Sequence, residues 1–232
     1  MLKSLTLIAA AAIIGFSGSA FAQASTPYAE MPAGKYSLDE THASIIWKVS
    51  HLGLSNYAGR FTKFDADLNF DPAHPEKSTL TASIDPTSIE TDYPYPEKKD
   101  FNAKLISGEK WFNAGEFPKI AFRSTKIEKT GETTGTMSGD LTFLGVTKPL
   151  SFDVTFNGAF AEQPFSKKPA IGFSAIGTMK RSDWGFGTYV PSIGDEVTIQ
   201  IEAEFGMGKP EEKATEKPAE TVEHTNKTEA AE

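Results

Sequence analysis

Apolar and polar residues alternate along most of the chain between Gly34 and Gly206, which is the pattern of half-buried β-strands. In residues 64–70 one parity is apolar, while the other carries aspartate and asparagine. The clearest case is 197–205, where valine, isoleucine, alanine and phenylalanine interleave with threonine, glutamine and glutamate. The same period recurs in 44–50, 79–84, 150–156 and 171–175. Each segment therefore predicts a strand with one apolar and one polar face.

Residues that favour chain reversal separate these segments. They are Asp71-Pro72, Asp85-Pro86, the stretch Gly131–Gly135, Gly145, Asn157-Gly158 and Gly194-Asp195. The next strand-like run after Asn157-Gly158 begins only near Pro169, so that pair does not predict a tight hairpin. With this spacing we expect about eight strands in an antiparallel all-β protein.

One stretch, Pro96–Phe112, is polar and poor in strand-forming residues. Within it, Phe101 and Leu105 stand at helical spacing. We therefore expect one short amphipathic helix over Glu97–Ile106, lying across one end of the sheet.

The N-terminal segment predicts export. Lys3 precedes an apolar run from Leu5 to Phe16, and Ala20-Phe21-Ala22 offers small residues for cleavage. The run is shorter than a membrane-spanning helix needs, so we expect a signal peptide over 1–22, no integral membrane span and a periplasmic location. A linker over 23–33, a β-domain over 34–206 and a disordered acidic tail over 207–232 complete the predicted organisation.

Composition narrows the function classes. The formal net charge of −8 argues against a nucleic-acid partner, whose phosphates require a basic face. The chain has no cysteine, so no disulfide stabilises the domain. Seventeen phenylalanines, three tryptophans and six tyrosines fit either a barrel with a lined cavity or a sandwich with a tightly packed core.

The sequence shows no catalytic pattern. A G-x-S-x-G elbow and phosphate-binding glycine loops are absent. His42 and His51 fall on opposite faces of a regular strand, so a shared metal is not expected. We therefore predict no enzymatic activity, no cofactor and no metal site.

Two loops carry arginines that could meet a ligand. Arg60 ends the glycine-containing segment 51–61, and Arg181 lies in the segment 180–185. Both could donate to an anionic or polar headgroup. Equally, both could pair with Asp65, Asp183 or loop carbonyl groups.

The order of several motifs resembles one known family. They are Tyr36-x-x-Asp39-x-x-His42, Trp47-x-Val49-x-His51-x-Gly53-x-Ser55, Gly59-Arg60-Phe61, Asp100 with Leu105, Trp111-Phe112, Phe117-Pro118-x-Ile120-x-Phe122, Gly139-Asp140-Leu141-Thr142-x-x-Gly145-Val146-Thr147-Lys148-Pro149, and Lys180-Arg181-Ser182-Asp183-Trp184-Gly185. Over roughly Gly34 to Phe205 the chain resembles the YceI-like, or polyisoprenoid-binding, proteins. The resemblance implies a lipocalin-like antiparallel barrel of about eight strands, periplasmic export and a lumen that holds an isoprenoid or a similar amphiphile.

The strand parities suggest which residues would line that lumen. The apolar candidates on the inward parity are Trp47, Val49, Phe64, Leu68, Phe122, Leu141, Phe143, Phe152, Val154, Phe173 and Val197. We expect a carrier for a long-chain isoprenoid, quinone-like or fatty-acid-like lipid, with Arg60 and Arg181 near its head. A homodimer and a membrane-protein delivery partner are further hypotheses. The rivals are a non-binding structural or stress-protective protein with a filled core, and an enzyme acting on such lipids with His42 or His51 as its base.

Overall fold

A computed structural model describes residues 25–208. The predicted signal peptide lies outside these residues, as does the predicted acidic tail apart from its first two positions. Within the described residues, no helix has the length and apolar character needed to cross a bilayer.

The described chain contains eleven strands and one α-helix. The strands are β1 (Gly34–Leu38), β2 (Ser44–His51), β3 (Ser55–Phe61), β4 (Phe64–Phe70), β5 (Thr79–Ile84), β6 (Ile89–Glu90), β7 (Ile120–Lys129), β8 (Thr134–Phe143), β9 (Val146–Phe160), β10 (Ala170–Lys180) and β11 (Ile193–Met207). The helix α1 covers Phe101–Ser107. Five 3₁₀ helices are η1 (Tyr28–Glu30), η2 (Glu40–His42), η3 (Pro75–Lys77), η4 (Pro86–Ser88) and η5 (Arg181–Trp184).

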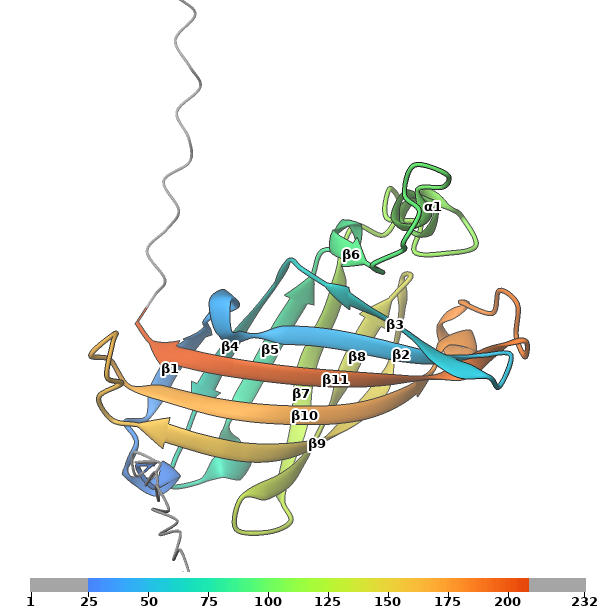
Figure 1. Ribbon diagram of the computed structural model, residues 1–232. Coiled ribbons are helices and arrows are strands. Elements are labelled where there is room, and N and C mark those ends of the chain that lie inside the picture. Colours follow the sequence, from blue (N-terminus) through green and yellow to red (C-terminus); the bar gives the residue numbers. More distant parts are fainter. Residues whose placement is uncertain (1–24, 209–232) are drawn as a thin grey trace, which may run out of the picture.

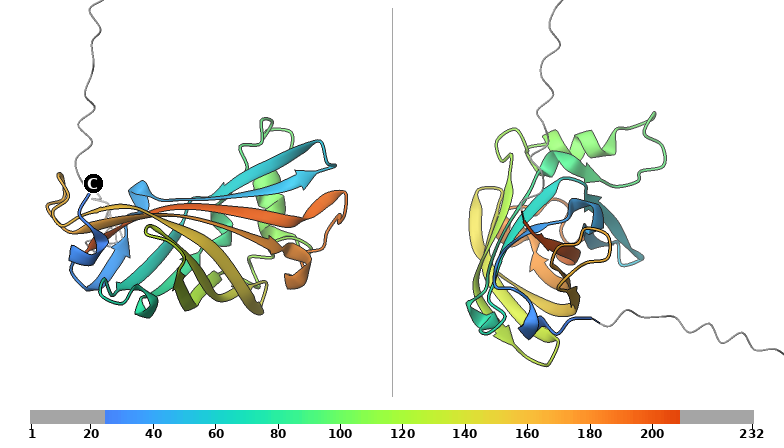
Figure 2. Two further views of the ribbon diagram at one scale, coloured as in Figure 1. Left: turned by 90° about the horizontal axis from the view of Figure 1, so that it is seen from below. Right: turned by 90° about the vertical axis from the view of Figure 1, so that its left-hand side faces the viewer.

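Eight of these strands form a closed antiparallel barrel. Their order is β1-β4-β5-β7-β8-β9-β10-β11, and pairing of β1 with β11 closes the ring. The strands curve around a common axis in the end-on view of Figure 2. The structure confirms the predicted barrel, and the ring closure excludes a sandwich.

The other three strands extend the sheet beyond β11. The long β11 pairs with β1 near Phe205 and with β2 over Val197–Glu202, so β1 and β2 succeed each other along the same edge. Beyond β11 the sheet continues through β2, β3 and β6, in that order, away from the ring. This extension lies at the α1 end of the barrel, opposite the end where β1 begins (Figure 1).

Helix α1 begins four residues later than predicted. The carboxylate of Asp100 accepts a hydrogen bond from the backbone N–H of Ala103 over 2.8 Å, which is the geometry of an N-cap. The preceding residues form a turn instead, because Lys98 and Lys99 donate their backbone N–H groups to Tyr95. Leu105 is the buried residue of the helix and packs against the barrel core.

Two of the predicted reversal signals prove to be strand irregularities. Asn157 and Gly158 lie inside β9, where Gly172 opposes Gly158 and Phe173 opposes Phe156, so Asn157 is the additional residue of a bulge. Gly158 has φ +156°, which glycine adopts readily. Gly194 and Asp195 lie inside β11, where the register with β2 shifts between Ile193 and Val197. The prediction that the chain reverses direction at these two pairs was wrong, because strand irregularities and turns favour the same residue types.

The segment before β1 packs on the barrel. Ser25 donates its hydroxyl to the Ala159 carbonyl oxygen, and Tyr28 meets the Phe156 ring edge-on at 5.8 Å. Met31 is only 3% exposed. The described part of the predicted linker therefore covers the end of the barrel at which β1 begins.

Candidate ligand-binding lumen

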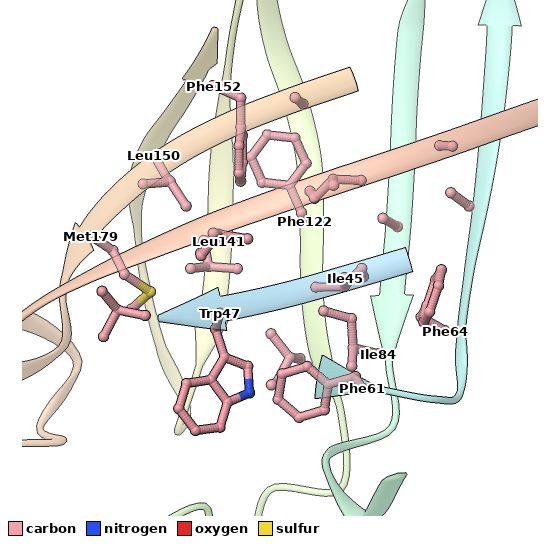
Figure 3. A pocket seen from close by; sticks show the side chains of 18 of the residues that line it. Ile45, Trp47, Phe61, Phe64, Ile84, Phe122, Leu141, Leu150, Phe152 and Met179 are labelled. Carbon is pink, nitrogen blue, oxygen red and sulfur yellow. The ribbon is translucent and has the colours of Figure 1, made fainter. Parts of the chain in front are cut away.

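The inward faces of the strands enclose one large apolar cavity. Its volume is about 830 Å³, within the range of about 300–1,000 Å³ typical of small-molecule sites. Strands of the ring contribute, among them β7 through Phe122 and β9 through Phe152, and β2 of the extension adds Trp47 (Figure 3). Two-residue alternation explains the arrangement, because every second side chain of each strand points inward.

The apolar residues predicted from strand parity all line this cavity. They are Trp47, Val49, Phe64, Leu68, Phe122, Leu141, Phe143, Phe152, Val154, Phe173 and Val197. Their position in the wall is thus a finding, while their contact with a ligand stays a prediction. Further residues of the same parity, which the sequence analysis did not select, complete the wall: Ile45, Phe61, Leu150, Met179, Ile199 and Ile201.

A series of aromatic rings leads from the lumen to the surface at the α1 end. The ring of Trp47 lies 6.2 Å from that of Tyr57, which lies 6.1 Å from Phe101. Phe101 lies 5.7 Å from Tyr93, and Tyr93 lies 6.3 Å from Tyr95, which is 51% exposed. An apolar chain can therefore remain in contact with aromatic surface over the whole path.

Two lysines stand at the same end. The Lys99 ammonium lies 5.2 Å from the centre of the Phe101 ring, and the Lys104 ammonium lies 5.4 Å from that of Trp111. Both lysines belong to the cavity lining. These cation–π contacts hold positive charge beside the aromatic path, where a polar or anionic headgroup could meet it. The sequence analysis missed these residues because they come from a segment without strand periodicity.

Arg181 borders the cavity but its hydrogen bonds hold the loop after β10. Its guanidinium donates to the carbonyl oxygens of Gly194, Phe186, Thr188 and Ile193 over 2.7–2.9 Å. The side chain is 4% exposed. Burial lowers the pKa of the guanidinium from its ordinary value, and the negative charge of Asp195 opposes that shift. Of the two interpretations left open by the sequence, this geometry is the pairing with loop carbonyl groups.

Arg60 lies outside the cavity lining of the described residues. Its guanidinium reaches Asp92 at 3.4 Å, and both side chains are at least half exposed. Neither of the predicted acidic partners, Asp65 or Asp183, provides this contact. A headgroup role for Arg60 or Arg181 stays a prediction.

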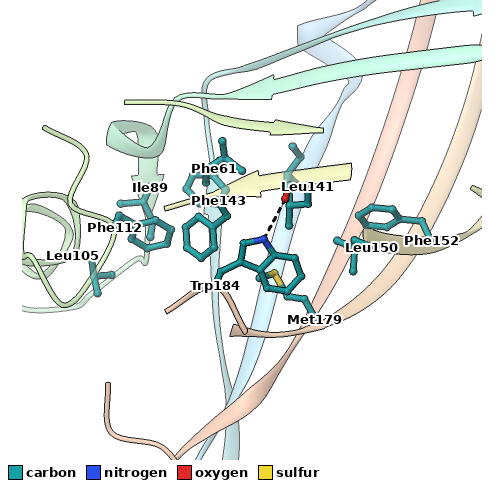
Figure 4. Close-up of a cluster of buried hydrophobic side chains, with 12 residues drawn as sticks. Phe61, Ile89, Leu105, Phe112, Leu141, Phe143, Leu150, Phe152, Met179 and Trp184 are labelled. Atoms are coloured by element: carbon teal, nitrogen blue, oxygen red, sulfur yellow. Dashed lines mark hydrogen bonds between the residues drawn. The ribbon is translucent and has the colours of Figure 1, made fainter. Parts of the chain in front are cut away.

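Trp184 belongs to a buried hydrophobic cluster next to the lumen. It is 3% exposed and donates its indole N–H to the carbonyl oxygen of Leu141 over 3.1 Å (Figure 4). Phe112, Phe143 and Met179 belong to the same buried cluster. This part of the core is therefore packed and hydrogen-bonded, in contrast to the open centre of the barrel.

The two histidines considered as bases lie in different surroundings. His51, at the end of β2, belongs to the cavity lining. His42 lies outside that lining and forms a contact of 2.9 Å between its Nδ1 atom and the Asp39 carboxylate. That contact raises the pKa of His42, mainly through the hydrogen bond. His42, Asp39 and Glu204 bring potential ligand atoms within 4.8 Å of one another, but all three lie outside the lumen.

The family follows from comparison with known proteins. The model of the YceI-like domain matches residues 36–205, which run from within β1 to within β11. The chain belongs to the YceI-like family. A UPF0312 protein of Pseudomonas putida strain GB-1 is 36% identical over 155 residues, covering 66% of this chain and 77% of the relative.

Solved structures of similar proteins agree with the barrel. The Campylobacter jejuni YCEI protein has a TM-score of 0.59 at 30% identity, covering 70% of this chain and 91% of its own. Burkholderia cenocepacia BcnA has a TM-score of 0.62 at 24% identity, covering 72% of this chain and 98% of its own. A polyisoprenoid binding domain from Saccharophagus degradans shares the fold with a TM-score of 0.54 at 14% identity, covering 74% and 97%. These likenesses show that the chain shares its barrel fold with solved YceI-like proteins.

Proposed function

We propose that this protein is a periplasmic carrier that holds one long apolar amphiphile in its barrel and catalyses no reaction. The cavity of about 830 Å³ along the inside of the barrel is the observation that carries this proposal. Membership of the YceI-like family and the likeness to a polyisoprenoid binding domain support an isoprenoid or similar lipid as cargo. The signal-peptide pattern of residues 1–22 supports the periplasmic location.

Burial of the tail supplies the driving force. Each methylene removed from water contributes about 0.8 kcal/mol, which is about a fourfold gain in affinity. Affinity should therefore rise with chain length until the tail fills the cavity. The head would lie at the α1 end, where Lys99 and Lys104 stand beside the aromatic path.

The chemistry of the wall supports binding rather than catalysis. Most of the wall is formed by aliphatic and aromatic side chains, which offer neither a nucleophile nor an acid–base pair. The homodimer and the membrane-protein delivery partner stay predictions.

The proposal can be tested with a variant that fills the lumen. Ala175 lines the cavity from β10, whereas the next residue, Ile176, is 45% exposed on the outer face. Ala175→Phe places a ring in the lumen, and Ile176→Phe adds the same ring outside. Binding of the fluorescent fatty acid cis-parinaric acid to the delipidated full chain should weaken at least about tenfold in Ala175→Phe and stay unchanged in Ile176→Phe. Equal binding in both variants, or no binding to the unmodified chain, would contradict the proposal.

A further inference from the structure

Trp47 carries an unpaired hydrogen-bond donor in the wall of the lumen. It lies in the middle of β2, between Gly59 of β3 and Ile199 of β11. Its indole lines the cavity, while its Nε1 atom is buried and meets no acceptor. Within residues 25–208 it is the one buried side-chain nitrogen or oxygen without a hydrogen-bond partner. Buried polar groups in folded proteins are nearly always paired, so this atom requires an explanation.

The second buried indole shows what pairing looks like in this fold. Trp184 donates its N–H to the Leu141 carbonyl oxygen over 3.1 Å (Figure 4). In Figure 3 the Trp47 nitrogen points to the side on which Phe61 is drawn. Its surroundings are apolar side chains of the lumen, and the neighbouring backbone groups are engaged in the strand pairing of β2 with β3 and β11. Within the described residues no protein group accepts from Nε1, so an acceptor has to come from outside the chain.

The position of this donor is set by a close approach to β3. A Cβ atom at Gly59 would lie 2.3 Å from Cζ2 of Trp47, so the indole rests directly on the glycine backbone. Tyr57 stands next to it on the same strand, with ring centres 6.2 Å apart. The indole is thus held against the wall before any ligand arrives, which limits the entropy lost on binding.

The geometry points to Trp47 as the residue that selects the cargo: its Nε1–H donates a hydrogen bond to a neutral acceptor on the ligand, a carbonyl oxygen above all. This inference rests on the proposed carrier function and adds the chemical class of the ligand. A carboxylate or phosphate would lose too much solvation against this apolar wall, and would instead remain near Lys99 and Lys104 at the α1 end. Because Nε1 is buried, the bound ligand must displace the side chains that cover it to bring its acceptor within hydrogen-bond distance.

Two matched ligands separate this inference from the carrier function. The first is undecyl methyl ketone, and the second is the alkene in which a CH₂ group replaces its carbonyl oxygen. Both present the same apolar tail, but only the ketone offers an acceptor. Trp47→Phe should weaken ketone binding about five- to tenfold, the size of one hydrogen bond, and should change alkene binding less than twofold.

The indole signals of the unmodified protein give a direct measurement. The ¹⁵N-labelled, delipidated full chain has three tryptophans and therefore three Nε1–H resonances, which Trp→Phe variants assign. The ketone should move the Trp47 resonance downfield, while that of Trp184, already bonded to Leu141, stays in place. The alkene should bind without the downfield shift. The shift is read from the unmodified protein, and the variants serve only to assign its three resonances.

The outcomes are distinct. Binding of both ligands with a stationary Trp47 resonance, and with equal affinities in Trp47→Phe, would overturn the role of Trp47 and leave the carrier function standing. Failure of both ligands to bind the unmodified chain would overturn the carrier function, and the inference with it.

Discussion

The Nε group of Arg181 donates to the carbonyl oxygen of Gly194 over 2.8 Å, which joins the start of η5 to the start of β11. Three further carbonyl oxygens of the same loop accept from this guanidinium. The buried cation therefore replaces the strand pairing that the irregular start of β11 interrupts.

Arg181→Met should destabilise the protein by about 3 kcal/mol, because it leaves buried carbonyl groups without donors. Arg60→Met should cost less than about 1 kcal/mol, since the Arg60–Asp92 pair is exposed to solvent. Urea unfolding followed by circular dichroism measures both changes. If Arg181→Met kept its stability and lost only lipid affinity, Arg181 would be a headgroup ligand and not a loop anchor.

The two buried indoles should respond differently to the same substitution. Trp184→Phe removes a hydrogen bond and leaves the Leu141 carbonyl oxygen unpaired, at a cost of about 2–3 kcal/mol. Trp47→Phe removes no hydrogen bond within the described chain, so it should cost at least about 1 kcal/mol less than Trp184→Phe. Thermal unfolding of the delipidated variants provides the comparison. Equal losses would show that Trp47 has a protein partner.

Gly59→Ala should affect both stability and binding. The added Cβ collides with the Trp47 ring, so the indole must move into the lumen, and overpacking of this kind costs about 1–3 kcal/mol. Ligand affinity should fall because the cavity narrows. Gly115→Ala is the matched control, since a Cβ there meets nothing within 4 Å. Unchanged binding and tryptophan fluorescence in Gly59→Ala would mean that the ring does not depend on Gly59.

The attachment of α1 should weaken in acid. The Glu90 carboxylate of β6 accepts from Asn102 of α1 over 3.0 Å, and from the backbone N–H groups of Asp92 and Thr91. The hydrogen bond from Asn102, followed by that from Asp92, lowers the pKa of Glu90 below its ordinary value of 4.5. A carboxyl group with a lowered pKa stabilises the fold above the ordinary value, and this contribution is lost as the pH falls through the folded-state pKa.

Hydrogen exchange of the α1 amides across this acidic range measures the effect. Protection should decline below about pH 4.5 in the unmodified chain. In Glu90→Gln it should be low already at neutral pH and change less with acid. Substitution of the exposed Glu109 by Gln should leave the profile as it was. An identical profile in Glu90→Gln would show that another group controls the helix.

Strand parity was sufficient to predict the barrel wall. Residues such as Phe152, Val154 and Phe173 could be placed in the lumen because alternation by two fixes the face of each side chain. The choice between barrel and sandwich could not be made from alternation, since it depends on the pairing of β1 with β11, two strands far apart in the sequence.

Local signals were least informative at irregular backbone. Asn157-Gly158 and Gly194-Asp195 mark disturbances inside long strands, although the same residues form turns elsewhere. The charge of Arg181 by itself predicts an exposed side chain. The residue is buried because surrounding carbonyl oxygens accept its hydrogen bonds, and these groups come together only in the folded chain. The aromatic path through Phe101 and Tyr93 depends on how α1 lies across the barrel end, which no periodicity encodes.

The central claim is that the lumen holds a lipid, and mass spectrometry of the full chain purified from its own cells tests it most directly. Native spectra should show the protein with an added mass, and denaturing spectra should release one amphiphile in stoichiometric amount. A bare protein mass in both, together with no rise in melting temperature on addition of isoprenoids, fatty acids or the methyl ketone, would contradict the account and favour a protein whose core binds nothing.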